Sequence, residues 1–348
     1  MQVAIIKLKN SFRVAIAIPI AHLILTHHKT NLEDLKDMLL ADAFHFAGML
    51  HFIYIPVQTQ YMLLVSPNCN DIMKPNIEWK EFPDGDAYIR IPGIKSCQGE
   101  NITLIHRLYP NQNSAIFTLL MTLDTLRRTG AHTTVISPYF PYSRQDKTFL
   151  EGEALSAQLL CRLLSQNGAV RLITLDCHFL KKPGEMEYAG LKITNITANQ
   201  HLIRYAIKKF GIDKPEIISP DQGANYLVSE FGGKSMSKVR GNYNDDDSKT
   251  QTYRQIKTLK MDFDVKGRNV IIIDDIIATG STMIKAVENV KKGGAKKVIC
   301  LATHGIFLNN SLEKLNSICD GIATTDSIPN PVATVPIKDI FAEFLSKG

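Results

Sequence analysis

The residues best suited to chemistry lie in the stretch 270–282, which reads VIIIDDIIATGST. Two adjacent carboxylates, Asp274 and Asp275, follow an apolar run and can face sugar hydroxyls or a metal ion bound to them. The motif ends in five small residues, Ala278, Thr279, Gly280, Ser281 and Thr282. The serine and the two threonines among them can each donate a hydrogen bond through a hydroxyl. Small side chains let backbone N–H groups approach phosphate oxygens. The stretch therefore predicts a site for a phosphate monoester that also carries hydroxyls.

A strand and a helix must position these groups. Residues 270–274 form an almost continuous apolar run, which predicts a strand buried on both faces, as in a parallel sheet. After the small residues, apolar side chains recur at helical spacing until Gly293-Gly294 ends the pattern. The unpaired N–H groups at the start of such a helix favour a phosphate. No Gly-Lys-Ser/Thr follows, so the loop is not a Walker A motif; the alternative is an ordinary buried strand with a polar end.

Two further stretches suit a purine nucleotide. Residues 137–147 read SPYFPYSRQDK, in which aromatic side chains precede Arg144, Gln145 and Asp146. An aromatic platform can hold a base, and an arginine can pair with its phosphates. Residues 81–90 read EFPDGDAYIR, where Phe82 can stack on a base while Asp84 and Asp86 accept hydrogen bonds. Taken alone, the first stretch is equally consistent with a surface turn, and the second with a Pro-Asp-Gly turn.

Two more polar motifs follow predicted strands. The sequence LITLDCH places His178 just beyond the strand at 171–175, and IISPDQG places Asp221 in an equivalent position. Open α/β sheets bind ligands at the carboxyl ends of their strands. His178 and Asp221 could hold a hydrated Mg²⁺ that phosphate oxygens also coordinate. Imidazole is an unusual magnesium ligand, so both a direct and a water-mediated histidine contact stay open; the alternative is a polar surface histidine.

Composition limits the class of protein. The chain has 348 residues, of which 45% are hydrophobic and 21% charged, as in a globular protein long enough for two domains. A net charge of +6 favours anionic small molecules and predicts no nucleic-acid partner. The apolar run Val14–Leu25 is too short to span a bilayer, so no membrane role is expected. The six cysteines form no CxxC pair, which predicts reduced thiols in a cytoplasmic protein without a zinc site.

Strand and helix patterns alternate from residue 61 onward, which predicts an α/β fold with parallel sheets and covering helices. Strands are expected at 61–65, 87–91, 102–106, 133–137, 171–175, 216–218, 270–274 and 297–302, and helices at 113–128, 153–166, 198–210, 281–292 and 310–316. We expect two domains, 61–196 and 197–348. Residues 1–60 are expected to be an accessory extension, or an upstream stretch that precedes a true start at Met62. The long polar loop 232–254 is expected to be functional or disordered.

Together the motifs resemble those of the ribose-phosphate pyrophosphokinases, the PRPP synthetases. The resemblance covers residues 61 to about 345 and includes FPDGD, PYFPYSRQDK, LDCH, SPDQG, KVR (238–240), the 274–282 loop, THGIF (303–307) and TTDSIP (324–329). Their order and spacing match the family pattern, and SPDQGA looks more like the short archaeal-type forms. The resemblance implies two related type I phosphoribosyltransferase-like domains. It also implies diphosphate transfer from Mg-ATP to the 1-hydroxyl of ribose 5-phosphate, with Mg²⁺ as cofactor.

The resemblance assigns roles to residues at matching positions. Phe82, Asp84 and Asp86 match adenine and ribose contacts that the family often takes from a neighbouring subunit, which implies a homo-oligomer with a shared ATP site. Arg144, Gln145 and Asp146 match the other ATP contacts, and His178 and Asp221 the magnesium positions. Lys238 matches the catalytic lysine, with Arg240 beside it. The ribose-5-phosphate site matches Asp274, Asp275 and the loop Ala278, Thr279, Gly280, Ser281 and Thr282.

The chain also departs from the family pattern. Asp86 stands where Glu is usual, and Ala278 where many relatives have Asp or Ser. His178 is followed by an unusual Phe-Leu-Lys-Lys-Pro, and the loop carries an acidic run at 245–247. Two alternatives stay open: a type I phosphoribosyltransferase that consumes PRPP, and a non-catalytic relative that senses nucleotides. The first would not need the RQD motif or a second domain, and the retained Lys238 argues against the second.

Overall fold

The computed structural model describes residues 3–8, 11–16, 62–240 and 256–346. The chain divides into two compact units, Met1–Tyr61 and Met62–Gly348. In the first unit, strands β1 (Val3–Leu8) and β2 (Ser11–Ile16) form an antiparallel hairpin. This division lies one residue beyond the expected start of the first domain at residue 61. The role of residues 1–60 stays a prediction.

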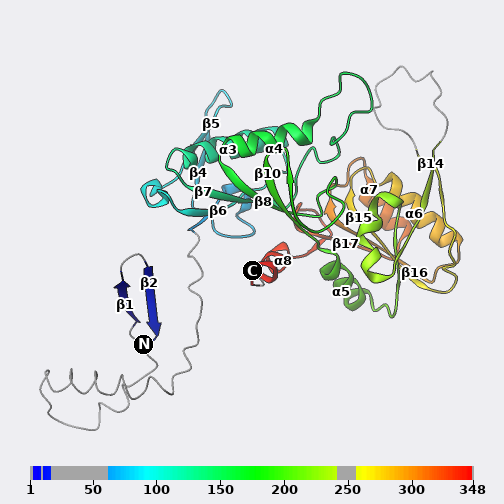
Figure 1. Cartoon of the computed structure of the whole chain (residues 1–348). Helices are drawn as coiled ribbons and strands as arrows, with labels where there is room; N and C mark the ends of the chain where they lie inside the picture. Colours follow the sequence, from blue (N-terminus) through cyan, green and yellow to red (C-terminus); the bar gives the residue numbers. More distant parts are fainter. Residues whose placement is uncertain (1–2, 9–10, 17–61, 241–255, 347–348) are drawn as a thin grey trace, which may run out of the picture. The chain divides into compact units, whose positions relative to one another are not determined.

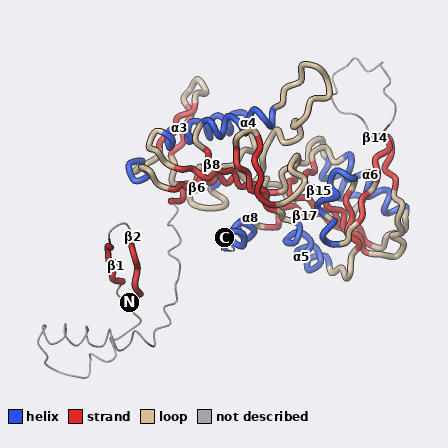
Figure 2. Tube along the Cα trace, viewed as in Figure 1, coloured by secondary structure: helices blue, strands red, loops and turns tan. Residues whose placement is uncertain are grey.

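The larger unit contains two six-stranded sheets, drawn in Figures 1 and 2. The N-terminal sheet has the order β3-β6-β7-β8-β10-β9, in which every pairing is parallel except that of β10 with β9. Its strands are β3 (Met62–Val65), β6 (Asn101–Ile105), β7 (His132–Ile136), β8 (Ala169–Leu175), β9 (Gly184–Tyr188) and β10 (Leu191–Ile196). Helices α3 (Gln112–Arg127) and α4 (Ser156–Gln166) pack on it. In α4 the buried residues Ala157, Leu160, Cys161 and Leu164 recur at helical spacing, so one face of the helix meets the sheet.

The C-terminal sheet is parallel throughout, in the order β12-β11-β15-β16-β17-β18. Its strands are β11 (Glu216–Ser219), β12 (Lys234–Ser235), β15 (Asn269–Ile277), β16 (Lys297–Gly305), β17 (Gly321–Thr325) and β18 (Ala333–Val335). Helices α6 (Ser281–Lys292) and α7 (Ser311–Ile318) contribute to the apolar cluster on one of its faces. The α/β class and the mainly parallel sheets predicted from the sequence are confirmed.

A shared apolar core joins the two sheets. One cluster of buried side chains includes Ile105 and Ile173 of the N-terminal sheet together with Ile273 and Leu301 of the C-terminal sheet. Helices α5 (Asn199–Phe210) and α8 (Ile337–Ser346) complete this cluster. The other face of β15 enters a separate cluster with α6 and α7, so this strand is buried on both faces, as its apolar run predicts. Both sheets therefore belong to one compact unit, and the predicted boundary at residue 197 falls between β10 and α5.

Two small hairpins lie outside the sheets. Strands β4 (Glu78–Glu81) and β5 (Ala87–Arg90) pair antiparallel, as do β13 (Ser237–Arg240) and β14 (Ile256–Lys260). The strand expected at 87–91 therefore exists, but it belongs to a hairpin and not to a parallel sheet. Its alternating intermediate and exposed side chains cannot support burial on both faces. Short 3-10 helices span Pro67–Cys69, Ile94–Cys97, Gln222–Leu227 and Ser229–Phe231.

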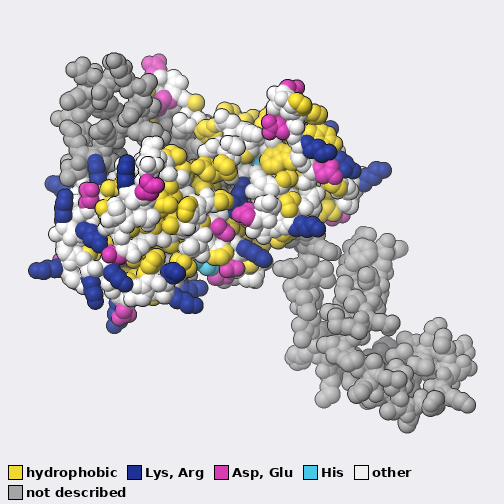
Figure 3. Space-filling model, turned by 180° about the vertical axis from the view of Figure 1, so that it is seen from behind, with side chains coloured by type: hydrophobic (Ala, Val, Ile, Leu, Met, Phe, Trp, Pro, Cys, Tyr) yellow, Lys and Arg dark blue, Asp and Glu magenta, His cyan; other side chains and the backbone are white. Residues whose placement is uncertain are grey.

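The surface seen in Figure 3 carries mixed charge. Lys and Arg side chains lie scattered among apolar and acidic ones over this face of the larger unit. The modest net charge of the sequence is in keeping with such a surface. Among the residues that the structure describes, no helix is both long and apolar enough to cross a membrane.

Candidate functional site

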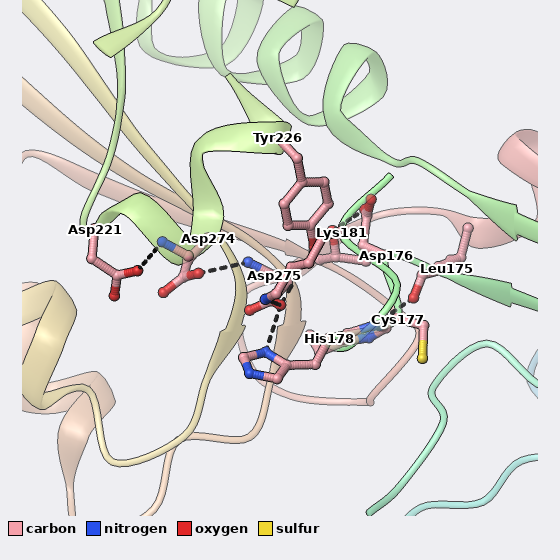
Figure 4. Close-up of polar contacts among 12 residues, drawn as sticks. Leu175, Asp176, Cys177, His178, Lys181, Asp221, Tyr226, Asp274 and Asp275 are labelled. Carbon is pink, nitrogen blue, oxygen red and sulfur yellow. Dashed lines mark hydrogen bonds and ion pairs between the residues drawn. The ribbon is translucent and has the colours of Figure 1, made fainter. Parts of the chain in front are cut away.

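The acidic pair lies inside strand β15 and not at its end. The strand continues past the expected end at Asp274 as far as Ile277, and β16 pairs with it there, with Ile277 opposite Gly305. Successive side chains of a strand point to opposite faces. Accordingly, Figure 4 shows Asp274 turned toward Asp221, while Asp275 is turned toward His178. The two carboxylates therefore have different surroundings.

Asp275 is held by two hydrogen-bond donors and one more distant cation, all from other elements. Its Oδ2 lies 2.7 Å from His178 Nδ1, 3.4 Å from the Tyr226 hydroxyl and 4.0 Å from Lys181 Nζ (Figure 4). His178 and Lys181 follow β8 in the N-terminal sheet, whereas Tyr226 lies on the 3-10 helix Gln222–Leu227. Burial acts to raise the pKa of Asp275, but the hydrogen bond and charge of His178, with Lys181, outweigh it and lower the pKa to about 2.

The ionised Asp275 fixes the orientation of the His178 ring. A carboxylate can only accept hydrogen bonds, so Nδ1 of His178 carries the proton that is shared with Asp275. In a neutral ring Nε2 is then an acceptor, with its lone pair directed away from Asp275. Carboxylate–histidine pairs of this kind orient histidines at metal sites. The structure thus brings together two residues that sequence reasoning had assigned to different ligands.

Asp274 and Asp221 form an electronegative group on the other side of β15. The pKa of Asp274 is raised well above its ordinary value, first by burial and then by the negative charges of Asp275 and Asp221. Asp221 caps the 3-10 helix through a 2.7 Å hydrogen bond from the backbone N–H of Gly223 to its Oδ1. Excess negative charge on carboxylate oxygens is what a divalent cation relieves, and Mg²⁺ prefers such ligands while keeping several waters. Asp221 and Asp274 are therefore carboxylates of the kind that would hold Mg²⁺.

The protein supplies few other metal ligands here. Within the described residues no group of three or more His, Cys, Asp or Glu side chains is arranged to hold a metal ion. A magnesium ion at this place would accordingly take most of its ligands from substrate oxygens and water, as Mg²⁺ commonly does.

The loop after β15 is shaped by backbone contacts. Gly280 adopts a positive φ of 72° and is the N-cap of α6, and a side chain there would place its Cβ 2.8 Å from Cβ of Ser311. The carbonyl oxygen of Ala278 accepts hydrogen bonds from the backbone N–H of Leu308, at 2.8 Å, and from the Ser311 hydroxyl, at 3.2 Å. Thr279 is exposed, and its hydroxyl lies 3.3 Å from that of Ser281. The first N–H groups of α6 need partners outside the helix, so the loop can receive a phosphate.

The predicted nucleotide residues lie on two separate segments. Phe82 is 52% exposed on the β4–β5 hairpin and contacts the ring of Tyr88, and the Asp84 carboxylate accepts from the backbone N–H of Asp86. Arg144 and Gln145 are exposed in the loop between β7 and α4. Among the described residues, no hydrogen bond or ring contact joins the hairpin to residues 144–146.

The loop with Arg144 lies near the junction of the two sheets. Burial raises the pKa of the Tyr139 hydroxyl, and the charge of Arg144 opposes that shift. The centroid of the Tyr139 ring in turn lies 4.9 Å from that of His304, which belongs to β16 of the other sheet. The segment that carries Arg144 thus contacts the C-terminal sheet through Tyr139.

The two predicted catalytic cations lie at the edge of the described chain. The backbone of Lys238 pairs with Leu259 and that of Arg240 with Ile256, with an irregularity between Val239 and Arg240. The acidic run at 245–247 lies outside the described residues. The catalytic roles of Lys238 and Arg240 stay predictions.

Sequence reasoning missed the contacts that hold the two sheets together at this place. Asp176 Oδ2 accepts from the Thr303 hydroxyl at 2.5 Å and from the backbone N–H of Ala198 at 3.0 Å. Burial raises the pKa of Asp176 to about 6, although these hydrogen bonds oppose the shift. His304 Nε2 lies 3.0 Å from the carbonyl oxygen of Leu175. The LDCH and THGIF motifs thus contact each other, which their separation in the sequence does not indicate.

Lys181 and Tyr226 are further site residues that no motif had indicated. Lys181 has a positive φ of 51°, and its Nζ lies 5.5 Å above the Tyr226 ring. The only sequence signal was the unusual Phe-Leu-Lys-Lys-Pro after His178, which shows a departure from the family pattern but not where the lysine points.

Comparison with known proteins agrees with this geometry. The family described as the N-terminal domain of ribose phosphate pyrophosphokinase matches residues 68–168, and the phosphoribosyl transferase domain family matches residues 198–337. A ribose-phosphate pyrophosphokinase of Sulfurisphaera tokodaii is 36% identical over 266 residues, which cover 76% of this chain and 88% of that protein. The chain belongs to the ribose-phosphate pyrophosphokinase family. Another member of this family, from Pyrococcus furiosus, is 33% identical, with 75% of this chain and 89% of that protein covered.

A solved structure of the family shows the same fold. The phosphoribosylpyrophosphate synthetase from Mycobacterium smegmatis aligns with a TM-score of 0.64 at 24% identity, covering 83% of this chain and 99% of that one. The resemblance to this family, and to its archaeal members, is therefore confirmed. The family match places the two sheets of the larger unit in a two-domain phosphoribosyltransferase fold.

Proposed function

We propose that the chain transfers diphosphate from Mg-ATP to the 1-hydroxyl of ribose 5-phosphate, with PRPP and AMP as products. Two relatives that are 36% and 33% identical to this chain carry the name ribose-phosphate pyrophosphokinase. The observation that carries the proposal is the juxtaposition of two features on β15 and its loop. The Asp221–Asp274 carboxylate pair suits a metal-bound phosphate chain and sugar hydroxyls, and the 278–282 loop suits a phosphate monoester.

Each part of the site then has a task. The loop 278–282 holds the 5-phosphate through the N–H groups of α6 and the hydroxyls of Thr279 and Ser281. Asp274 accepts hydrogen bonds from the ribose 2- and 3-hydroxyls. Asp275, which sequence reasoning gave the same role, instead orients His178 through the 2.7 Å hydrogen bond between them. The anomeric hydroxyl is thereby placed for an in-line attack on the β-phosphorus, and AMP departs.

Charge neutralisation is the second requirement of the reaction. Mg²⁺ held by Asp221 and Asp274, with His178 through water, would offset the charge of the phosphate chain. Lys238 and Arg240 serve as cations for the transferring diphosphate, as the family resemblance implies. Lys181 adds a further cation at the junction of the sheets, since its Nζ is only loosely paired with Asp275 at 4.0 Å and its side chain is 41% exposed.

The nucleotide is proposed to lie between two subunits. Arg144, Gln145 and Asp146 bind it from one chain, and the exposed hairpin with Phe82, Asp84 and Asp86 reaches it from another. The 52% exposure of Phe82 supports this arrangement, because a base stacked on the ring would cover it. The active form is accordingly a homo-oligomer that works in the cytoplasm on ATP and ribose 5-phosphate.

The proposal is tested by following the products and then one variant. Incubation with ribose 5-phosphate and Mg-ATP should release AMP and form PRPP. Consumption of PRPP with a free base would indicate the alternative of a phosphoribosyltransferase, and no turnover would indicate a nucleotide-sensing relative. Asp274→Asn should weaken ribose 5-phosphate binding, measured by calorimetry, far more than ATP binding. Asp262→Asn, an exposed aspartate away from the loop, is the matched control. If Asp274→Asn weakened the binding of ATP and of ribose 5-phosphate equally, the assignment of Asp274 to the sugar would be contradicted.

A further inference from the structure

The loop that carries His178 and Lys181 crosses the end of another strand. It connects β8, which ends at Leu175, with β9, which begins at Gly184. These two strands are not neighbours in the sheet, because β10 lies between them in the order β8-β10-β9. Since β10 runs parallel to β8 and antiparallel to β9, the loop 176–183 has to pass over the carboxyl end of β10.

Asn195 lies on β10 at this crossing. It stands opposite Thr174 of β8 on one side and Gly184 of β9 on the other. The residue is 2% exposed, and its carboxamide reaches both ends of the loop. Its Oδ1 accepts from the backbone N–H of Cys177 at 2.9 Å, and its Nδ2 donates to the carbonyl oxygen of Lys182 at 2.8 Å. One buried side chain thus ties both ends of the loop to the sheet.

The two ties need both halves of a carboxamide. A backbone N–H can only donate and a carbonyl oxygen can only accept, so the amide of Asn195 must turn its oxygen toward Cys177 and its nitrogen toward Lys182. A carboxylate has no donor for the Lys182 carbonyl, and an aliphatic side chain of similar shape supplies neither group. Backbone groups that lose such a partner in the interior cost free energy, so the loop should move away from β10 without Asn195.

Between the two ties, the loop presents the side chains that meet Asp275. His178 follows the first tied residue and Lys181 precedes the second. Their Nδ1 and Nζ atoms lie 2.7 Å and 4.0 Å, respectively, from Oδ2 of Asp275 on the other sheet. The middle of the loop is held separately, because the ring centroids of Phe179 and Tyr188 lie 4.6 Å apart. Loss of the ties should therefore displace the two polar residues while this ring contact remains.

We propose that Asn195 is a positioning residue of the reaction, which holds His178 and Lys181 against Asp275 through the backbone of their loop. This role rests on the proposed function, because it belongs to the same site. Asn195 is buried and acts only through the loop. Its replacement should therefore lower turnover and leave the KM for ribose 5-phosphate unchanged, since that substrate is assigned to the loop 278–282.

The hold on the loop is measured without turnover, by trypsin acting on the folded full chain. Lys181 and Lys182 are exposed, so trypsin can cut between them once the backbone is released, whereas Pro183 protects the bond after Lys182. Asn195→Leu removes both ties, and Asn195→Asp, when ionised, removes only the tie to Lys182. Cleavage after Lys181, followed by mass spectrometry, should become about tenfold faster in Asn195→Leu and less so in Asn195→Asp. Equal cleavage rates in wild type and both variants would overturn the proposal.

Turnover then shows whether Asn195 acts through the lysine. Asn195→Leu should lower the rate of AMP release about tenfold. The double variant with Lys181→Met should be no slower than Asn195→Leu alone, because the lysine is already displaced. If the two losses multiplied, to about a hundredfold, the positioning role would be wrong, since a general structural defect adds to the loss of the lysine.

Asn167→Leu is the matched control. The Nδ2 of Asn167 donates to the carbonyl oxygen of Leu163 at 2.8 Å, at the end of α4 and before the start of β8, whereas the loop follows the end of β8. This variant should keep the cleavage rate and the turnover of wild type, and circular dichroism checks the folding of every variant. If wild-type protein released no AMP, the proposed function would be contradicted, and the cleavage rates alone would decide whether Asn195 holds the loop.

Discussion

Protonation of His304 should destabilise the fold by an amount that the structure sets. The ring is 1% exposed, and its Nε2 lies 3.0 Å from the Leu175 carbonyl while its Nδ1 lies 2.8 Å from the Ser327 hydroxyl. Burial lowers the pKa of His304 from 6.5 to about 4, although the hydrogen bond to Leu175 opposes the shift. The folded protein therefore accommodates the neutral imidazole of His304 better than the charged imidazolium.

The sign of the pH dependence follows from linkage. The unfolded chain takes up the proton near pH 6.5 and the folded chain only near pH 4, so the unfolded state binds more protons in between. The stability that the neutral ring confers is complete above the unfolded pKa and is lost as the pH falls toward the folded one. Between about pH 7.5 and about pH 4.5 this loss amounts to about 2.5 kcal/mol for a single histidine with these two values.

Comparison with His304→Gln isolates this group, because every other titrating residue is common to both proteins. Denaturant unfolding is measured across that pH range for wild type and variant. The free energy of unfolding of wild type, relative to the variant, should fall by about 2.5 kcal/mol. His132→Gln, at an exposed histidine on β7, is the control for loss of an imidazole. A wild-type-minus-variant difference that stays constant with pH would refute the reasoning.

Two more predictions concern the candidate site. Lys181→Met should lower turnover by about tenfold, which corresponds to about 1.4 kcal/mol in the activation free energy. The control Lys182→Met, which removes the neighbouring exposed lysine, should leave turnover unchanged. Equal kinetics for both variants would show that Lys181 is not part of the site. Gly280→Ala should cost about 1–3 kcal/mol in unfolding experiments and weaken ribose 5-phosphate binding, because it adds both a strained φ and a 2.8 Å contact with Ser311. The control Gly267 shares the positive φ, but a Cβ added there would meet no neighbouring atom. If Gly267→Ala lowered the free energy of unfolding as much as Gly280→Ala, the contact with Ser311 would be shown to be unimportant.

The spacing of apolar residues predicted the strands and helices of the fold, because buried positions recur at the period of a strand or of a helix. The run at 270–274 identified β15, and the helical spacing after it identified α6 to its last residue. The same patterns did not show where β15 ends, since the hydrogen bonds that extend it past the aspartates come from β16. Residues 87–90 form a strand as predicted, but only the pairing with β4 shows that it is a hairpin. Pairing partners are distant in sequence and leave no local signal.

The candidate site was predictable in its residue types but not in its contacts. Asp275 and His178 each stood out by position after an apolar run, yet they lie 97 residues apart and nothing local indicates that they meet. Lys181 reaches the site through a positive φ that its sequence does not require. The alternation of β15 then decides that Asp274 and Asp275 face different partners, a consequence of the strand continuing through them.

The apolar cluster that joins the two sheets has a consequence for exchanging parts between relatives. A chimera made at residue 197 would combine Ile105 and Ile173 of one parent with Ile273 and Leu301 of another in a single interior. Interiors pack densely, so side chains of mismatched size would leave voids or clashes on both sides of the junction. We therefore expect the corresponding halves of two relatives to be interchangeable only when the residues that make these contacts are exchanged with them. Sequence changes in one half should be accompanied by compensating changes in the other.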